Sequence, residues 1–123
     1  ETSDVLGRLG RADIALNLSE SESFSMVCLE AMAAGRPVIA SRCGGPEELL
    51  ESGQGGVLVA NRDADDAAAA IVKLALDPHL RATMGAHGHR EALGRFDTRI
   101  TSEALLRQYE SVIGRRALRV AKL

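Results

Sequence analysis

The sequence predicts an α/β fold with a Rossmann-like parallel sheet and flanking helices. Short apolar stretches alternate with helical stretches along the chain. The connections between the apolar stretches are too long for hairpins, which favours parallel strands joined by right-handed crossovers. Glycine, proline and capping residues stand where the predicted elements begin and end.

The first half of the chain predicts two strands and the helix between them. Residues 12–18 form a short apolar run that we interpret as a buried strand, followed by a polar stretch over residues 19–25. Residues 24–34 predict a helix that begins at a serine cap and ends at Gly35, with Pro37 beyond it. Residues 37–41 predict the second strand.

The second half predicts a third strand and four helices. Gly45 is the expected cap of a short helix that has Pro46 in its first turn and ends near Glu51. The other elements are a strand over residues 57–60, a helix from Asp63 to Leu76, a helix from Asp77-Pro78 weakened by Gly85 and Gly88, and a last helix from Asp97 to about Gly114.

Three short strands are few for a parallel sheet, which needs cover on both faces and partners at its edges. The stretch from Thr2 to Leu9 resembles the tail of a helix whose preceding strand is absent. We therefore expect the chain to be an incomplete domain. Upstream residues or a second copy of the chain would supply the edge.

The composition indicates one globular domain and excludes several functional classes. Of 123 residues 46% are hydrophobic, and 15 Lys and Arg residues stand against 17 Asp and Glu residues. This balance, with only two Phe, one Tyr and no Trp, argues against nucleic-acid binding. No apolar run reaches the roughly 20 residues of a membrane span, and residues 1–10 lack the pattern of a signal peptide. We therefore expect a cytoplasmic protein.

A ligand crevice is expected at the carboxyl ends of the strands, where residues 19–25, 42–47 and 61–63 would lie. The first of these segments leads into a helix N-terminus, where free backbone N–H groups attract an anion such as a diphosphate. The expected donors belong to Ser23, Phe24, Ser25, Met26 and Val27. Glu20 and Glu22 would repel a bare phosphate but accept hydrogen bonds from hydroxyl groups, so the ligand would be part sugar and part phosphate. A serine-rich helix cap without a ligand is the alternative.

Glu30 is the only charged residue between Glu22 and Arg36, in a helix that is apolar almost all round. A buried carboxylate needs a hydrogen-bonding partner, and ribose hydroxyls would suit it. One long ligand held by Glu22 and Glu30 fits the spacing better than an acid/base pair. The alternative is an internal salt bridge from Glu30 to Arg36 or Arg42.

The remaining reactive side chains carry weaker signals. Cys28 and Cys43 are expected to be free thiols in a reducing compartment. His87 and His89 have no Cys or acidic cluster beside them, which favours surface residues over a metal site. Residues 114–123 carry four basic side chains and no acidic one. They predict contact with an anionic membrane, at the inner face of the cell membrane, or with another domain; a frayed, solvated tail is the alternative.

The motifs together resemble the donor-binding domain of retaining GT-B glycosyltransferases of the group 1 family. The family motif is two glutamates separated by seven residues, here Glu22 and Glu30. They lie within the run from Glu22 to Ser41, which contains Leu-Glu-Ala-Met-Ala and Gly-x-Pro-Val and precedes Gly44-Gly45-Pro46-Glu47. The resemblance covers nearly the whole chain.

The resemblance implies transfer of a sugar, with retention, from a nucleotide-sugar to the hydroxyl of a glycan or lipid-linked acceptor. Glu22 would be the catalytic glutamate beside the donor sugar and its phosphate, and Glu30 would bind the ribose. No metal and no cofactor are implied. The donor-binding residues would be Ser19, Glu22, Ser23, Phe24, Ser25, Met26, Val27, Glu30, Gly44 and Gly45. The chain departs from the family at Ser23 and Ser25, where glycine is usual, and at Leu18, where proline is usual.

The resemblance also implies what these residues leave out. The acceptor-binding domain and the first half of the donor domain, with its diphosphate-binding Arg and Lys, lie outside the sequence. We expect the isolated chain to bind nucleotide weakly and to be inactive. The alternatives are a fragment of a nucleotide-sugar epimerase and a non-catalytic α/β interaction module.

Overall fold

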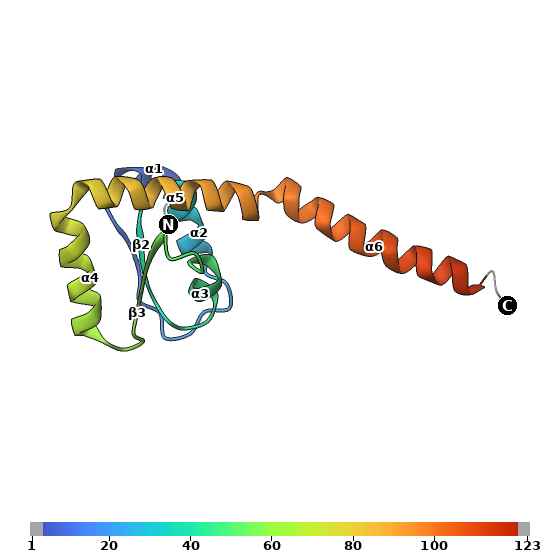
Figure 1. Ribbon diagram of the computed structural model, residues 1–123, viewed down its shortest axis with the longest axis horizontal. Coiled ribbons are helices and arrows are strands. Elements are labelled where there is room, and N and C mark those ends of the chain that lie inside the picture. Colours follow the sequence, from blue (N-terminus) through green and yellow to red (C-terminus); the bar gives the residue numbers. More distant parts are fainter. Residues whose placement is uncertain (1–3, 121–123) are drawn as a thin grey trace. The chain divides into compact units, whose positions relative to one another are not determined.

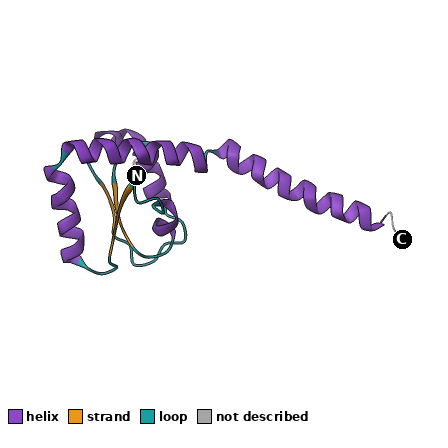
Figure 2. Cartoon of the chain, viewed as in Figure 1, coloured by secondary structure: helices purple, strands orange, loops and turns teal. Residues whose placement is uncertain are grey.

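The computed structural model describes residues 4–120, without the side chains of Leu6 and residues 114–120. The chain forms two compact units, residues 1–93 and residues 94–123. Figures 1 and 2 show the elements of each. In the first unit they are α1 (Val5–Arg11), β1 (Ala15–Asn17), α2 (Met26–Ala33), β2 (Val38–Ser41), α3 (Gly45–Leu49), β3 (Gly56–Val59), α4 (Ala64–Leu76) and most of α5 (Pro78–Phe96); α6 (Thr98–Val120) belongs to the second.

The three strands form one parallel sheet in the order β1-β2-β3, which confirms the predicted fold class. Ala15 pairs with Val38, and Val38 pairs in turn with Gly56. Each strand lies within about one residue of its predicted position, except that β1 is a short segment inside the predicted range of residues 12–18. All four residues of β2 are buried, as expected for the central strand of a sheet covered on both faces.

Helices cover both faces of the sheet, and the β1 edge stays partly exposed. On one face, α4 packs Ala67, Ala70 and Leu74 against Ile39 and Val59. The other face is covered by α2 and α3 (Figure 1). Their buried side chains include Cys28, Met32 and Leu49. Leu16 and Leu18 at the β1 edge stay about half exposed, at 49% each. The central and β3 side of the sheet therefore holds the core.

The part of α5 in the first unit crosses the turns that precede β2 and β3. A Cβ atom on Gly85 would overlap the carbonyl oxygen of Gly35, and one on Gly88 would lie 3.4 Å from the carbonyl oxygen of Gly55. Nδ1 of His89 lies 2.7 Å from the carbonyl oxygen of Ala33. From the sequence alone, the two α5 glycines are predicted to weaken the helix. The structure shows that the absence of their side chains lets α5 approach the amino ends of the strands.

Two predicted helix boundaries are wrong. The cap of α3 is Gly44, at a φ of 112°, while Gly45 is the first helical residue. The last helix does not end near Gly114 but continues to Val120, because a single glycine costs only about 1 kcal/mol inside a helix. The interactions predicted for residues 114–123 concern side chains outside the described part of the chain. Between residues 4 and 120, no helix has the length and apolar character of a membrane span.

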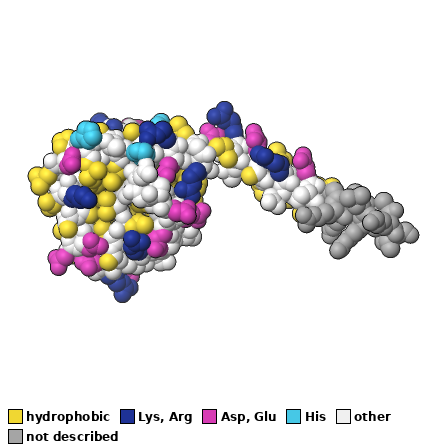
Figure 3. All heavy atoms as spheres, in the orientation of Figure 1, with side chains coloured by type: hydrophobic (Ala, Val, Ile, Leu, Met, Phe, Trp, Pro, Cys, Tyr) yellow, Lys and Arg dark blue, Asp and Glu magenta, His cyan; other side chains and the backbone are white. Residues whose placement is uncertain are grey.

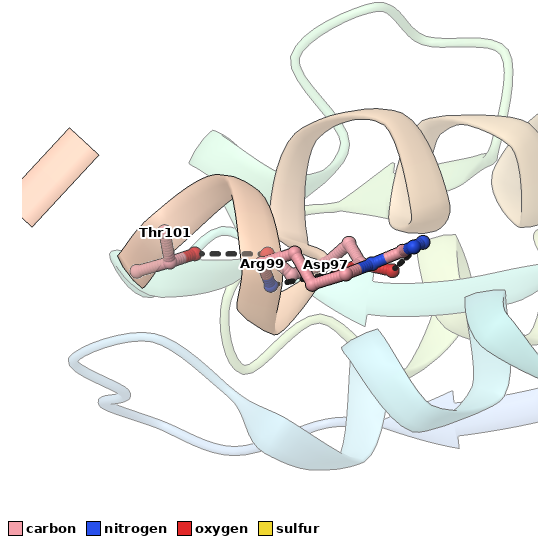
Figure 4. Close-up of polar contacts among 3 residues, drawn as sticks. All are labelled: Asp97, Arg99 and Thr101. Atoms are coloured by element: carbon pink, nitrogen blue, oxygen red, sulfur yellow. Dashed lines mark hydrogen bonds and ion pairs between the residues drawn. The ribbon is translucent and has the colours of Figure 1, made fainter. Parts of the chain in front are cut away.

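The second unit is dominated by α6. Asp97 starts this helix: its Oδ1 accepts a hydrogen bond from the backbone N–H of Arg99 at 2.8 Å, and its carbonyl accepts one from the Thr101 hydroxyl at 3.3 Å (Figure 4). The Arg99 guanidinium also bonds the Asp97 carboxylate at 3.2 Å. The hydrogen bonds from the side chain and the backbone N–H of Arg99 lower the pKa of the Asp97 carboxyl. The predicted cap at Asp97 is therefore confirmed.

Candidate functional site

Three loops meet at the carboxyl ends of the strands, as the parallel topology predicts. Glu22 forms an isolated parallel bridge with Gly44, in which its N–H donates to the carbonyl of Cys43 at 3.1 Å. The Ser41 hydroxyl donates to the carbonyl of Ser19. The side chain of Asn61 donates to the carbonyl of Glu20 at 2.9 Å. The loops after β1, β2 and β3 are thus joined around the first predicted glutamate.

The Glu22 carboxylate is half-buried and held on one side. Its Oε1 accepts hydrogen bonds from Ser19 Oγ at 3.0 Å and from Asn17 Nδ2 at 3.2 Å. Both hydrogen bonds that the described residues donate to this carboxylate end on Oε1. Oε2 therefore accepts no hydrogen bond from the described residues and keeps its accepting capacity.

Ser25 begins α2 in an unusual backbone conformation. Its φ of 74° and ψ of 81° lie in the left-handed region, and its Oγ accepts a hydrogen bond from the N–H of Cys28 at 3.4 Å. The first turn of a helix leaves N–H groups without an intrahelical acceptor, here those of Met26 and Val27. Both side chains are more than half exposed, at 58% and 52%. The side chains at the start of α2 are therefore exposed at the two residues whose N–H groups have no intrahelical acceptor.

Gly44 and Gly45 support Glu22. The N–H of Gly45 donates to the carbonyl of Glu22 at 2.8 Å, and a Cβ on Gly45 would overlap the backbone of Phe24. The N–H of Gly44 donates to Oε2 of Glu47 at 2.9 Å. These N–H groups are thus occupied within the loop, and the absence of side chains is what lets the two loops approach.

Glu30 is placed differently from the sequence interpretation. It lies in α2 and is half-buried, because this helix is apolar without being enclosed: Met26 and Val27 face solvent. The salt-bridge alternative is wrong as well. Arg36 donates to the carbonyl of Gly10 at 2.7 Å, and Arg42 lies 4.0 Å from Glu47. Neither of the two arginines considered as partners therefore pairs with Glu30.

A second tether holds the loop after β1 from the β3 side. Arg62 pairs with the Glu20 carboxylate at 2.5 Å. Arg62 has a φ of 61°, and it and Ser25 are the two residues other than glycine with positive φ in the described chain. Such conformations are strained and gather at functional sites. Beside this tether, Leu18, Ser41 and Asp63 contribute to the lining of a cavity of about 250 Å³.

Among the described residues, the thiol and imidazole side chains do not form a second candidate site. Cys28 and Cys43 are free thiols, as the sequence predicts, and burial raises the pKa of Cys28. Across the described residues, no three His, Cys, Asp or Glu side chains gather where they could hold a metal ion. On the face drawn in Figure 3, acidic and basic side chains of the first unit are interspersed rather than separated.

Sequence comparison identifies the family. Glycosyl transferases group 1 matches residues 1–91 of the chain. The chain belongs to this family. The matched segment holds the sheet and all three loops around Glu22, so the candidate site is a part of a group 1 glycosyltransferase domain.

Named relatives agree with this assignment. The D-inositol 3-phosphate glycosyltransferase of Corynebacterium jeikeium is 39% identical over 109 residues, which are 89% of this chain and 26% of that protein. The phosphatidyl-myo-inositol mannosyltransferase of Mycolicibacterium smegmatis is 41% identical over 93 residues, covering 76% of this chain and 24% of that protein. The chain thus spans about a quarter of the length of these curated relatives.

Solved structures share the fold. Anabaena HepE in complex with UDP superposes with a TM-score of 0.86 at 28% identity, over 89% of this chain and 30% of that one. The complex of the same protein with UDP-glucose superposes with a TM-score of 0.79 over 85% and 29%. The parallel sheet and its helices therefore match the C-terminal domain of GT-B glycosyltransferases.

Sequence reasoning missed one residue of this site, Asn17. It lies inside a predicted buried strand, where only apolar side chains are expected. An asparagine among apolar neighbours at the carboxyl end of such a strand was the available signal. Only the structure shows that its amide reaches Glu22, Ser25 and Cys28.

Proposed function

We propose that the chain is the C-terminal part of the donor-binding domain of a retaining glycosyltransferase. The proposed enzyme moves a sugar from a nucleotide-diphosphate sugar to the hydroxyl of a glycan or lipid-linked acceptor. The acceptor oxygen replaces the diphosphate at the anomeric carbon, and the configuration of that carbon is kept. The acceptor-binding domain and the rest of the sheet lie outside this sequence in the proposal.

The observation that carries the proposal is the arrangement around Glu22. Its Oε2 is left for a ligand, and three residues later Ser25 opens a helix N-terminus. A carboxylate oxygen accepts sugar hydroxyls, whereas helix N–H groups bind phosphate oxygens. A nucleotide-sugar carries both chemistries. Anabaena HepE, which shares this fold, binds UDP and UDP-glucose.

The proposed roles follow the order of groups in such a donor. Glu22 lies beside the sugar, and the N–H groups of Ser25, Met26 and Val27 hold the diphosphate. Glu30, half-buried on the same helix, binds the ribose hydroxyls. Ser23 and Phe24 flank the diphosphate, while Gly44 and Gly45 keep Glu22 in place.

Titration of the 123-residue chain with UDP, GDP and ADP, each with and without its sugar, tests the proposal. Backbone amide NMR shifts are expected to change at residues 22–30 and 44–47 and to saturate at millimolar concentration. Glu30→Ala is expected to weaken binding of every nucleotide, because all carry the ribose. Glu22→Gln is expected to remove the difference between nucleotide and nucleotide-sugar.

A matched control is Glu110→Gln on α6, a glutamate that lies in the second unit. It is expected to bind like the unchanged chain. The donor-site assignment is overturned if no nucleotide shifts residues 22–30 at about 10 mM, a concentration that fills roughly nine-tenths of a site with a dissociation constant of about 1 mM. With the complete enzyme, a product with inverted configuration contradicts retention, and an epimerised nucleotide-sugar indicates an epimerase.

A further inference from the structure

The carboxamide of Asn17 connects the two parts of the candidate donor site. Asn17 is the last residue of β1 and is only 8% exposed. Its Nδ2 donates to Oγ of Ser25 at 2.6 Å and to Oε1 of Glu22 at 3.2 Å, and Sγ of Cys28 lies at 3.6 Å. One amide group therefore touches both the glutamate and the residue that caps α2.

The other end of the same side chain is also occupied. Oδ1 accepts hydrogen bonds from the hydroxyl of Ser19 at 2.7 Å and from its backbone N–H at 3.2 Å. This pattern fixes which end of the amide faces Glu22. A rotation that exchanged the two ends would set Oδ1 against the Glu22 carboxylate and Nδ2 against an N–H group, so the hydrogen-bond network allows one orientation.

A buried amide has a cost that an apolar side chain would not have. The cost is offset only when its donors and acceptor find partners, and here every partner except Cys28 lies on the loop after β1. The Ser25 end of the network supports a left-handed backbone, and the Glu22 end leaves Oε2 open. The network therefore orders the functional loop rather than the core.

We propose that Asn17 is a positioning residue for the donor. It acts through Glu22, whose carboxylate it orients toward the sugar, and through Ser25, whose backbone it holds so that the helix N–H groups face the diphosphate. This inference rests on the proposed donor-binding function. It adds a residue whose own side chain need not touch the ligand.

The test compares three variants of the 123-residue chain with UDP and UDP-glucose as probes. Asn17→Ala removes the amide, Asn17→Asp keeps its shape but removes both donors, and Asn61→Ala removes the other side-chain amide bond to the same loop, at the carbonyl of Glu20. Backbone amide NMR reports the loop without ligand and the dissociation constants with ligand. Denaturant unfolding separates loss of stability from loss of binding.

Without ligand, both Asn17 variants are expected to shift the amides of Glu22, Ser25 and Cys28. With ligand, Asn17→Ala is expected to raise the dissociation constant of UDP-glucose about tenfold. Asn17→Asp is expected to raise it further, since it sets a second carboxylate against Glu22. Asn61→Ala is expected to change it less than about twofold, because it leaves the Glu22 carboxylate and Ser25 in place.

A double-mutant cycle separates positioning from a general structural role. If Asn17 acts through Glu22, Asn17→Ala weakens UDP-glucose binding less in a Glu22→Ala background, which lacks the carboxylate that accepts from the Asn17 amide, than in the unchanged chain. Equal effects in both backgrounds would overturn the proposal. It would also be overturned if Asn61→Ala bound UDP-glucose as weakly as Asn17→Ala does. If the unchanged chain binds UDP and UDP-glucose but Asn17→Ala binds them equally well, only this inference fails. If the unchanged chain binds neither probe, the donor site itself fails and this inference with it.

Discussion

Gly85 of α5 packs directly on the carbonyl oxygen of Gly35, the residue that follows the cap of α2. There is no room for a side chain at this contact, since a Cβ on Gly85 would overlap that oxygen. Gly35 itself has a φ of 70°, so its carbonyl is set by a left-handed turn that glycine adopts without strain. The contact fixes how closely α5 approaches the sheet.

Gly85→Ala is expected to destabilise the first unit by about 1–3 kcal/mol, because either α5 or the turn at Gly35 must move. Gly94→Ala is the matched control in the same helix, where a Cβ meets nothing within 4 Å. That substitution is expected to stabilise α5 by about 0.5–1 kcal/mol. Urea unfolding of both variants measures the difference, and equal midpoints would contradict the packing at Gly85.

Ser25→Gly is expected to destabilise the chain less than Ser25→Ala. Both remove the hydroxyl that accepts from the N–H of Cys28 and from Asn17, but glycine also relieves the positive φ. Because a cap and a buried acceptor are lost, Ser25→Ala is expected to lower the free energy of unfolding by about 2–3 kcal/mol. Ser25→Gly is expected to lower it by about 1 kcal/mol less. Denaturant unfolding gives the order, and a less stable glycine variant would show that φ carries no strain here.

Cys43 is expected to react with a thiol reagent well before Cys28. Burial raises the pKa of Cys28, so its nucleophilic thiolate is scarce at neutral pH, whereas Cys43 is partly exposed. Mass spectrometry after short exposure to iodoacetamide at about pH 8, below the ordinary thiol pKa, would locate the first modified residue. Faster modification of Cys28 would contradict its burial.

The same thiol makes stability fall in alkali. A pKa that is higher in the folded chain than in the unfolded chain gives stability that is complete below the ordinary thiol pKa and is lost as the pH rises through the folded value. The free energy of unfolding should therefore decline above about pH 9, the ordinary value for the thiol. Cys28→Ala is expected to flatten this decline, and an unchanged slope would assign it to other groups.

The start of α6 is expected to open in acid. Arg99 lowers the pKa of Asp97 through hydrogen bonds from its side chain and its backbone, so the cap is complete above the ordinary aspartate pKa and is lost as the pH falls through the lower folded value. The amide signals of Arg99 and Thr101 should report this loss. In Asp97→Asn, which caps without a charge, the same signals should stay constant with pH.

Two helix starts could be predicted from the sequence because their capping chemistry is local. Asp63 accepts hydrogen bonds from the N–H groups of Asp65 and Asp66, and Ser25 caps α2, both as expected. The convergence of the three loops follows from parallel topology alone. The strand pattern and the serine cap together are therefore enough to place Glu22 and Ser25 at the head of α2.

The burial of side chains could not be predicted in the same way. An apolar composition suggested that α2 surrounds Glu30 with neighbours, but Met26 and Val27 face solvent. Asn17 was missed for the opposite reason, since its partners come from loop and helix residues that the strand pattern does not describe. Tertiary contacts decide both cases, and periodicity carries no information about them.

The close contacts of the α5 glycines and the loops around Glu22 lie at opposite ends of the sheet. Gly85 and Gly88 pack against the turns before β2 and β3. The loops that surround Glu22 instead follow the carboxyl ends of the strands. Substitutions in the loops around Glu22 therefore leave the α5 contacts at the other end of the sheet unchanged, so effects on the free energy of unfolding at the two ends are expected to add.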